Sequence, residues 1–285
     1  MTRTCRVGDV TIGPGSPLAI IAGPCTLESP ELGLEVGRVL KDVCASLGLS
    51  FIFKASFDKA NRTSIASPRG PGLASGLEAL ANIRETLGVP ITTDVHLPEQ
   101  CDAVGAVADM LQIPAFLCRQ TDLLLSAAQS ARSHGRAVSI KKGQFLSPEE
   151  MGGPVRKISE GGCENVLLLE RGTFFGYNRL VNDFIGLGDL MELDCSGFTD
   201  LGPPPVCFDV THSTQLPGSG QQTGGRPERG PMLARAATAS GVHALFIEAH
   251  PNPKEALSDG ATQLALNEVA GVLESVAAIR GALRA

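Results

Sequence analysis

Basic side chains recur just after several short apolar runs of the sequence. Six of them follow runs of strand type: Lys54, Lys59, Arg62, Arg119, Lys141 and Arg171. Cations crowded around one cavity repel one another unless anions fill it, and guanidinium and ammonium groups commonly bind phosphate and carboxylate. Any one of these residues, taken alone, is equally well explained as a solvated charge at a rim. Together they predict a site for small molecules that carry several negative charges in two separate groups.

A second set of residues offers the donor atoms of a metal site. It consists of one thiol, one imidazole and two carboxylates: Cys25, His212, Glu248 and Asp259. A mixed sulfur, nitrogen and oxygen set suits a borderline divalent ion such as Mn²⁺, Fe²⁺, Co²⁺ or Zn²⁺. The four residues lack the short spacing of a metal motif, and a cysteine in a strand is more often a small core residue. The pattern alone therefore leaves both interpretations open.

Lys54 supports an alternative chemistry. A lysine that follows a barrel strand and is surrounded by other cations is the kind of residue that an aldolase uses as a Schiff-base nucleophile. Nucleotide binding and serine-hydrolase chemistry are not indicated, because the sequence contains no G-x-G-x-x-G, Walker or G-x-S-x-G motif.

The elements that must position these residues alternate in type along the chain. Short runs rich in β-branched and apolar residues, typical of strands, cover 18–22, 50–55, 90–94, 110–113, 137–141, 165–170, 206–210 and 244–248. Segments of helical period cover 30–47, 76–87, 98–106, 121–134, 148–160, 229–240 and 262–283. This alternation predicts parallel βαβ units, in an open doubly wound sheet or a closed barrel. Eight units in 285 residues favour one α/β domain over residues 1–285, a (β/α)₈ TIM barrel with an N-terminal β-hairpin over residues 1–13.

The carboxyl ends of the strands surround the active site in such a barrel. The basic residues and the metal donors follow different strands, so we expect them to meet at this end. The long loop at 217–231 belongs to the same end. Lys141 and Lys142 are adjacent in a strand and must point to opposite faces, but spacing does not decide which one enters the barrel.

Composition excludes several classes of protein. The chain has 24 Lys and Arg against 30 Asp and Glu, a net charge of −6, which argues against binding to nucleic acid or to a membrane surface. No apolar run approaches the length of a membrane span. The eight cysteines are scattered without a C-x-x-C pair, which is typical of reduced thiols in a cytoplasmic protein.

Several motifs resemble the 3-deoxy-D-manno-octulosonate 8-phosphate synthase family. They are IAGPC at 21–25, FKASFDKANRT at 53–63, RGPG at 69–72, TDVH at 93–96, QIPAFLCRQTD at 112–122, KKGQF at 141–145, RG at 171–172 with FGY at 175–177, FDVTH at 208–212 and FIEAHP at 246–251. The most specific is the KANR stretch, because related synthases that use a different aldose phosphate have proline at the position of Asn61. The resemblance runs almost from end to end.

The resemblance implies a homotetrameric (β/α)₈ transferase of lipopolysaccharide biosynthesis. It would condense phosphoenolpyruvate with D-arabinose 5-phosphate and water and release phosphate. The metal-dependent branch of that family has cysteine at the position of Cys25, and SDGATQL at 258–264 also resembles that branch. The resemblance thus favours the metal interpretation of Cys25, His212, Glu248 and Asp259. A synthase for another aldose phosphate and a Schiff-base aldolase at Lys54 stay as alternatives.

The same motifs imply roles for individual residues. Phosphoenolpyruvate would be held by Lys54, Lys59, Gln112, Lys141 and Arg171, with Ser56 near its carboxylate. The aldose phosphate would be held by Asn61, Arg62 and Thr63, with Asp94 near its hydroxyls, and Arg119 would reach the sugar phosphate of a neighbouring subunit. The residues expected to act in catalysis are Lys54, Lys59, Asn61, Asp94 and His212, of which His212 would relay a proton through a metal-bound water.

Overall fold

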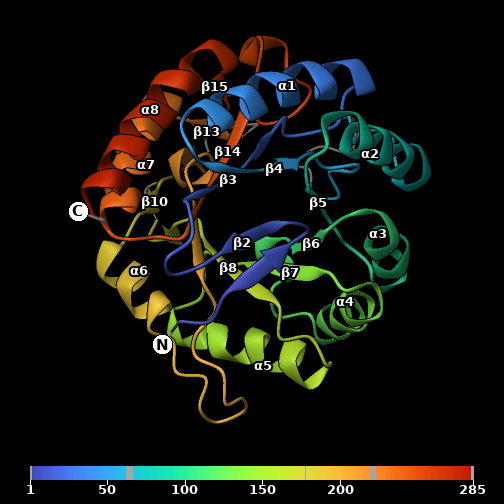
Figure 1. The fold of residues 1–285 in the computed structure, drawn as a ribbon, viewed down its shortest axis with the longest axis vertical. Helices are drawn as coiled ribbons and strands as arrows, with labels where there is room; N and C mark the ends of the chain where they lie inside the picture. Colours follow the sequence, from blue (N-terminus) through green and yellow to red (C-terminus); the bar gives the residue numbers. More distant parts are fainter. Residues whose placement is uncertain (1, 62–66, 177, 219–222, 284–285) are drawn as a thin grey trace.

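The computed structural model describes residues 2–61, 67–176, 178–218 and 223–283. Within these ranges a ring of parallel strands forms the centre of the molecule (Figure 1). Its members are β3 (Ala19–Gly23), β4 (Ser50–Lys54), β5 (Ile91–Asp94), β6 (Met110–Ile113), β7 (Ala137–Lys141), β8 (Val166–Glu170), β11 (Val206–Asp209) and β14 (Ala244–His250). The ring closes because β14 pairs in parallel with both β11 and β3. The predicted TIM barrel is therefore confirmed.

Helices surround the strands on the outside (Figure 1). They are α1 (Pro30–Ser46), α2 (Leu73–Leu87), α3 (Cys101–Val107), α4 (Thr121–His134), α5 (Gly152–Glu160), α6 (Phe184–Met191), α7 (Gly230–Ala239) and α8 (Leu266–Ala282). Helix α6 was not predicted; it is short and is capped by Asp183, whose side chain accepts a hydrogen bond from the backbone N–H of Ile185. The start of α8 is four residues later than predicted, since Leu264–Ala265 forms a short strand, β15, that pairs with β14. No described helix is both long and apolar enough to traverse a bilayer.

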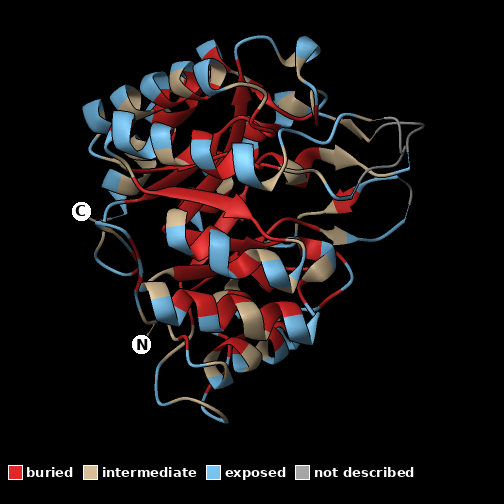
Figure 2. Ribbon diagram, turned by 90° about the vertical axis from the view of Figure 1, so that its right-hand side faces the viewer, coloured by how far each residue is buried: buried red, intermediate tan, exposed pale blue. Residues whose placement is uncertain are grey.

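Strand alternation divides the apolar interior into two layers. The outer layer joins strands to helices, and its members include Phe53, Leu168 and Val206. The inner layer fills the barrel with Ile52, Leu167 and other side chains. Each helix buries the face that it turns to the strands and exposes the other, as Figure 2 shows by colour.

The predicted N-terminal hairpin is present and closes one end of the barrel. It consists of β1 (Cys5–Val7) paired antiparallel with β2 (Val10–Ile12). Cys5, Val7 and Ile12 are fully buried and belong to the inner layer of the barrel core. In Figure 1 the hairpin lies across the middle of the strand ring.

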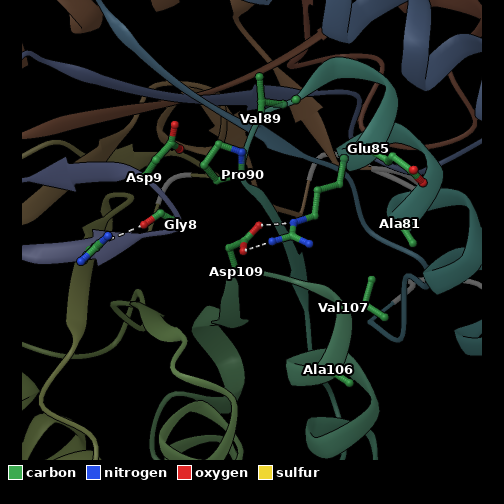
Figure 3. Close-up of a pocket in the computed structure, with 12 residues that line it drawn as sticks. Gly8, Asp9, Ala81, Glu85, Val89, Pro90, Ala106, Val107 and Asp109 are labelled. Carbon is green, nitrogen blue, oxygen red and sulfur yellow. Dashed lines mark hydrogen bonds and ion pairs between the residues drawn. The ribbon is translucent and has the colours of Figure 1, made fainter.

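A cavity of about 750 Å³ lies beside this hairpin, between Gly8, Pro90 and Asp109 (Figure 3). Asp109 is buried, and its carboxylate accepts two hydrogen bonds from Arg84, at 2.8 and 2.9 Å, and one from Arg136 at 3.0 Å. It also accepts the backbone N–H of Ile91 at 3.0 Å. Both oxygens of the Asp109 carboxylate thus have hydrogen-bond partners, as a buried charge requires.

Candidate active site

The carboxyl ends of the strands surround a second cavity, of about 610 Å³. Most of the residues that the sequence predicts for the site line this cavity: Lys54, Lys59, Asn61, Asp94, Lys141, Arg171, His212, Glu248 and Asp259. Cys25, Ser56 and Gln112 contact these residues directly, as described below. Arg62 and Thr63 lie outside the described residues.

Three of the four predicted metal donors converge at one side of the cavity. The donor atoms of Cys25, Glu248 and Asp259 lie within 4.8 Å of one another, and Sγ of Cys25 is 3.1 Å from Oδ2 of Asp259. The fourth donor, His212, places Nε2 3.6 Å from Oε2 of Glu248 and 3.9 Å from Oδ2 of Asp259. Oε2 of Glu248 is buried and accepts no hydrogen bond from the described residues. This oxygen is thus available to a cation, and the donor set fits a borderline divalent ion.

The cysteine and the two carboxylates affect one another electrostatically. The pKa of the Cys25 thiol is raised above its usual range by burial, and the negative charges of Glu248 and Asp259 raise it further. The thiol donates its proton to Asp259, which adopts a left-handed backbone conformation with φ of 50°. Aspartate tolerates this conformation better than most residues. Gln263 joins the two segments, because it accepts the backbone N–H of Cys25 at 3.2 Å and donates to the carbonyl of Ser258 at 2.8 Å.

Asp209 orients His212, a role that sequence reasoning misses. Nδ1 of His212 is 2.8 Å from Oδ2 of Asp209, and since a carboxylate has no proton to give, the proton of this hydrogen bond belongs to Nδ1. Nε2 is then free to act as a ligand on the side of Glu248 and Asp259, as in many metal centres. Burial would raise the pKa of Asp209, but its interactions with His212 and with the ammonium group of Lys141 lower it below its usual range. In the sequence, Asp209 and His212 stand three positions apart in the FDVTH motif, and this spacing could have indicated their contact.

Lys54 and Lys59 are held by different partners. Nζ of Lys54 donates to Oε1 of Glu248 at 2.5 Å and to the carbonyl of Cys25 at 3.1 Å, and both ion-pair partners are buried. Nζ of Lys59 donates to Oγ of Ser56 at 2.9 Å. Burial would lower the pKa of Lys59, but electrostatic interactions with Cys25, Glu248 and other acidic groups raise it above its usual range. Lys59 therefore stays an ammonium ion that can bind an anion.

Asp94 is an ionised carboxylate in the cavity wall. Burial would raise its pKa, but the positive charges of Lys54 and Lys59 hold the pKa well below the usual range. Ser56 and Gln112 both donate hydrogen bonds to this carboxylate from the two neighbouring strand ends. Their observed contacts thus fix Asp94, whereas the resemblance associates them with phosphoenolpyruvate.

Lys141 and Arg171 provide the positive charges on the opposite wall. Lys141 donates to Oδ2 of Asp209 at 2.9 Å, and its Nζ lies 3.9 Å from the ring centre of Phe246. Arg171 donates through Nη2 to Gln215, while its buried Nη1 has no hydrogen-bond partner among the described residues. An unpartnered guanidinium nitrogen in a cavity is suited to accept an anionic ligand. Lys141 is thus the member of the lysine pair that enters the barrel.

Arg119 lies apart from this group. It follows a short 3₁₀ turn at Ala115–Leu117 and is exposed. Its backbone carbonyl accepts a hydrogen bond from Lys157 at 3.0 Å. Phe116, three residues earlier, lines the cavity and is half exposed. Arg119 itself is not among the described residues that line the cavity.

Comparison with known proteins agrees with this geometry. A sequence model of the DAHP synthetase I family matches residues 2–283. A protein of Cyanothece sp. named 2-dehydro-3-deoxyphosphooctonate aldolase is 49% identical over 276 residues, which cover 96% of each chain. Proteins of the same name from Nitrobacter winogradskyi and Protochlamydia amoebophila are 52% identical over 263 residues (92% of this chain and 88% of the relative) and 49% identical over 261 residues (91% and 90%). The chain therefore belongs to the DAHP synthetase I family.

Proposed function

We propose that this protein condenses phosphoenolpyruvate with D-arabinose 5-phosphate and water, to give 3-deoxy-D-manno-octulosonate 8-phosphate and phosphate. The observation that carries the proposal is that one cavity is lined by Lys54, Lys59, Lys141 and Arg171, beside Cys25, Glu248 and Asp259 and the imidazole of His212. Such a cavity suits two phosphorylated substrates bound side by side. The relatives' name denotes an eight-carbon product, which a three-carbon and a five-carbon substrate supply together.

The chemistry follows from holding both substrates in one place, which makes their reaction effectively unimolecular. C3 of phosphoenolpyruvate attacks the aldehyde carbon of the open-chain pentose, and a carbon–carbon bond forms. Water adds to C2, where positive charge develops, and one of its protons goes to the alkoxide formed from the aldehyde. The C2 hydroxyl then loses its proton to become the carbonyl of the product, as the phosphate leaves with the oxygen that joined it to C2. Lys141 and Arg171 would stabilise the negative charge on the departing phosphate.

The residues of the donor set fit a divalent ion, and this chain would then belong to the metal-dependent branch of the synthases. Cys25, His212, Glu248 and Asp259 would hold the ion, and Asp209 would orient His212 toward it. A bound ion of this kind supplies Lewis-acid polarisation of an oxygen ligand. The identity of the ion is one of Mn²⁺, Fe²⁺, Co²⁺ and Zn²⁺.

Two alternatives are less well supported. A synthase for a four-carbon aldose phosphate would form a seven-carbon product, and Asn61 stands where such enzymes have proline. An aldolase that forms a Schiff base would need the amine of Lys54 to be available, but its Nζ donates hydrogen bonds to Glu248 and to the carbonyl of Cys25. Asn61 thus favours arabinose 5-phosphate as the substrate, and the hydrogen bonds of Lys54 favour a synthase over an aldolase.

The proposal also covers the domain, the assembly and the cellular location of the protein. We propose a single cytoplasmic domain over residues 1–285 that assembles as a homotetramer in which the exposed Arg119 reaches a neighbouring active site. The partly exposed Phe116 and Phe174 pack 6.4 Å apart at the cavity rim, and such apolar residues are suited to a subunit contact. The pathway would be lipopolysaccharide biosynthesis.

The test is release of phosphate from phosphoenolpyruvate in the presence of D-arabinose 5-phosphate, of erythrose 4-phosphate, or of no aldose. We expect release only with the pentose phosphate, loss of most activity after chelation, and recovery with Mn²⁺ or Co²⁺. Release with erythrose 4-phosphate alone would favour the first alternative. No release with either sugar would refute the synthase.

A further inference from the structure

Lys142 follows Lys141 in the chain but points away from the barrel interior, into the space between two loops. Only 1% of its surface is exposed. Its Nζ donates to the carbonyl of Leu146 at 3.0 Å and to Oγ1 of Thr173 at 3.0 Å, and it lies 3.4 Å from Oε2 of Glu170. One buried ammonium group thus joins the loop after β7 to the loop after β8.

Glu170 uses its other oxygen to shape the start of the second loop. Oε1 accepts the backbone N–H groups of Arg171 at 2.9 Å and Gly172 at 2.6 Å. Gly172 has a φ of 88°, a conformation that favours glycine, and a Cβ at this position would lie 3.0 Å from Cβ of Leu180. The chain therefore turns sharply at Gly172, immediately after the residue whose guanidinium group enters the cavity.

The two loops are joined by a further hydrogen bond. The backbone N–H of Phe174 donates to the carbonyl of Gln144 at 2.7 Å. Neither Lys142 nor Glu170 is among the described residues that line the cavity, whereas their chain neighbours Lys141 and Arg171 are. A buried charge pair that contacts backbone groups and the Thr173 hydroxyl of these two loops is well placed to determine where the loops hold their ligands.

We infer that Lys142 and Glu170 are positioning residues, which hold the guanidinium group of Arg171 at the place where it binds the phosphoryl group of phosphoenolpyruvate. The inference rests on the proposed function for the identity of the ligand. The position of Arg171 does not depend on that identity. Loss of the pair would release the turn at Gly172 and let Arg171 move away from Gln215.

The experiment compares wild type with Lys142→Met, with Glu170→Gln and with the double variant. Either single change leaves a buried partner without its counterpart and can prevent folding, whereas the double variant removes both charges and keeps similar side-chain shapes. The control is Arg3→Met with Glu164→Gln, because Arg3 and the partly exposed Glu164 form an ion pair at 2.7 Å and neither is among the described residues that line the cavity.

For the double variant we expect the KM for phosphoenolpyruvate to rise about tenfold, with kcat and the KM for D-arabinose 5-phosphate within about twofold of wild type. The Arg3→Met, Glu164→Gln control should have the wild-type kcat and the wild-type KM for each substrate. A double variant that folds with an unchanged KM for phosphoenolpyruvate would overturn the inference, as would equal losses in all three values, which indicate general structural damage.

A crystal structure of the double variant gives a readout that does not depend on activity. We expect the hydrogen bond between Arg171 and Gln215 to be lost, and an unmoved Arg171 would overturn the inference. Absence of phosphate release by the wild type would instead refute the proposed function, so the two failures are distinguishable.

Discussion

Nδ1 of His212 lies 2.8 Å from Oδ2 of Asp209, and the same oxygen accepts a hydrogen bond from Lys141 at 2.9 Å. One buried carboxylate therefore fixes a residue of the metal-donor set and a cation of the substrate cavity at once. This arrangement makes the position of the imidazole dependent on the strand that carries the lysine.

Replacement of Asp209 by asparagine should weaken metal binding by about 10- to 100-fold, because the imidazole loses the carboxylate that fixes its orientation. Competition with a chelator of known affinity measures this loss. The control is Asp102→Asn, which disrupts an exposed pair of the same kind, since Asp102 lies 3.0 Å from His134. Unchanged metal affinity in Asp209→Asn would contradict the role assigned to Asp209.

Replacement of Cys25 by asparagine should abolish the sulfur-to-metal absorption of the Co²⁺-loaded protein and reduce metal affinity. The amide would leave Glu248 and Asp259 in place but remove the thiolate ligand. The family resemblance implies asparagine at this position in a metal-independent branch, so some chelator-resistant turnover is expected. The control Cys44→Ala alters a buried cysteine on α1 and should leave the cobalt spectrum unchanged. Retention of the sulfur band in Cys25→Asn would exclude Cys25 as a ligand.

Borohydride treatment in the presence of either substrate should yield no covalent adduct on Lys54. Its amine is engaged by Glu248 and by the carbonyl of Cys25, and the proposed reaction needs no imine. Mass spectrometry of the peptide that contains Lys54 provides the measurement. A reduced adduct at this residue would establish the aldolase alternative.

Replacement of Asp109 by asparagine should lower the free energy of unfolding by about 3 kcal/mol, because it removes a buried charge that binds Arg84 and Arg136. Denaturant titration measures the loss. The kinetic constants at 25 °C should stay near those of wild type, because the site lies at the opposite end of the barrel. A stability change below about 0.5 kcal/mol would show that the pairs contribute little.

Acidification should destabilise the protein through His243. Burial and the nearby charge of Arg280 lower the pKa of His243 to about 4, while the unfolded chain titrates near 6.5. The unfolded state therefore binds more protons between these values, so the contribution of His243 is complete above pH 6.5 and is lost as pH falls toward 4. The loss amounts to about 3 kcal/mol at most.

The His243→Asn variant isolates this contribution. Nδ1 of His243 accepts the backbone N–H of Val206 at 3.1 Å, and the Oδ1 atom of asparagine can accept the same hydrogen bond without titrating. Unfolding measured between pH 7 and pH 4 should therefore show a shallower pH dependence in the variant. Identical slopes would mean that His243 does not titrate on unfolding.

The sequence was sufficient for the barrel because each strand carries its own apolar signal. Ile52 and Phe53 are adjacent in β4, and they pack in the inner and outer layers respectively, as alternation requires. Helix α6 was missed because its eight residues include two glycines and are too few to show a helical repeat of apolar residues. Its position depends instead on packing against the rest of the barrel.

The sequence predicted most of the residues that line the candidate site, but not which of them contact one another. Residue types after the strands identified the cations and the metal donors, because strand ends converge in this fold. The partners of Ser56 and Gln112 were not predictable, since both donate to Asp94 across strands whose register only the folded chain defines. Gln263 was missed for the same reason, as it lies 238 positions from the backbone group that it binds.

The hairpin formed by Cys5–Val7 and Val10–Ile12 affects where small molecules can enter and leave the barrel. Because its buried side chains fill the amino-terminal end of the barrel, we expect reactants and products to enter and leave at the carboxyl end, where the described cavity lies. Two substrates that both enter from that end would bind in order, the deeper one first, and we expect product release in the opposite order.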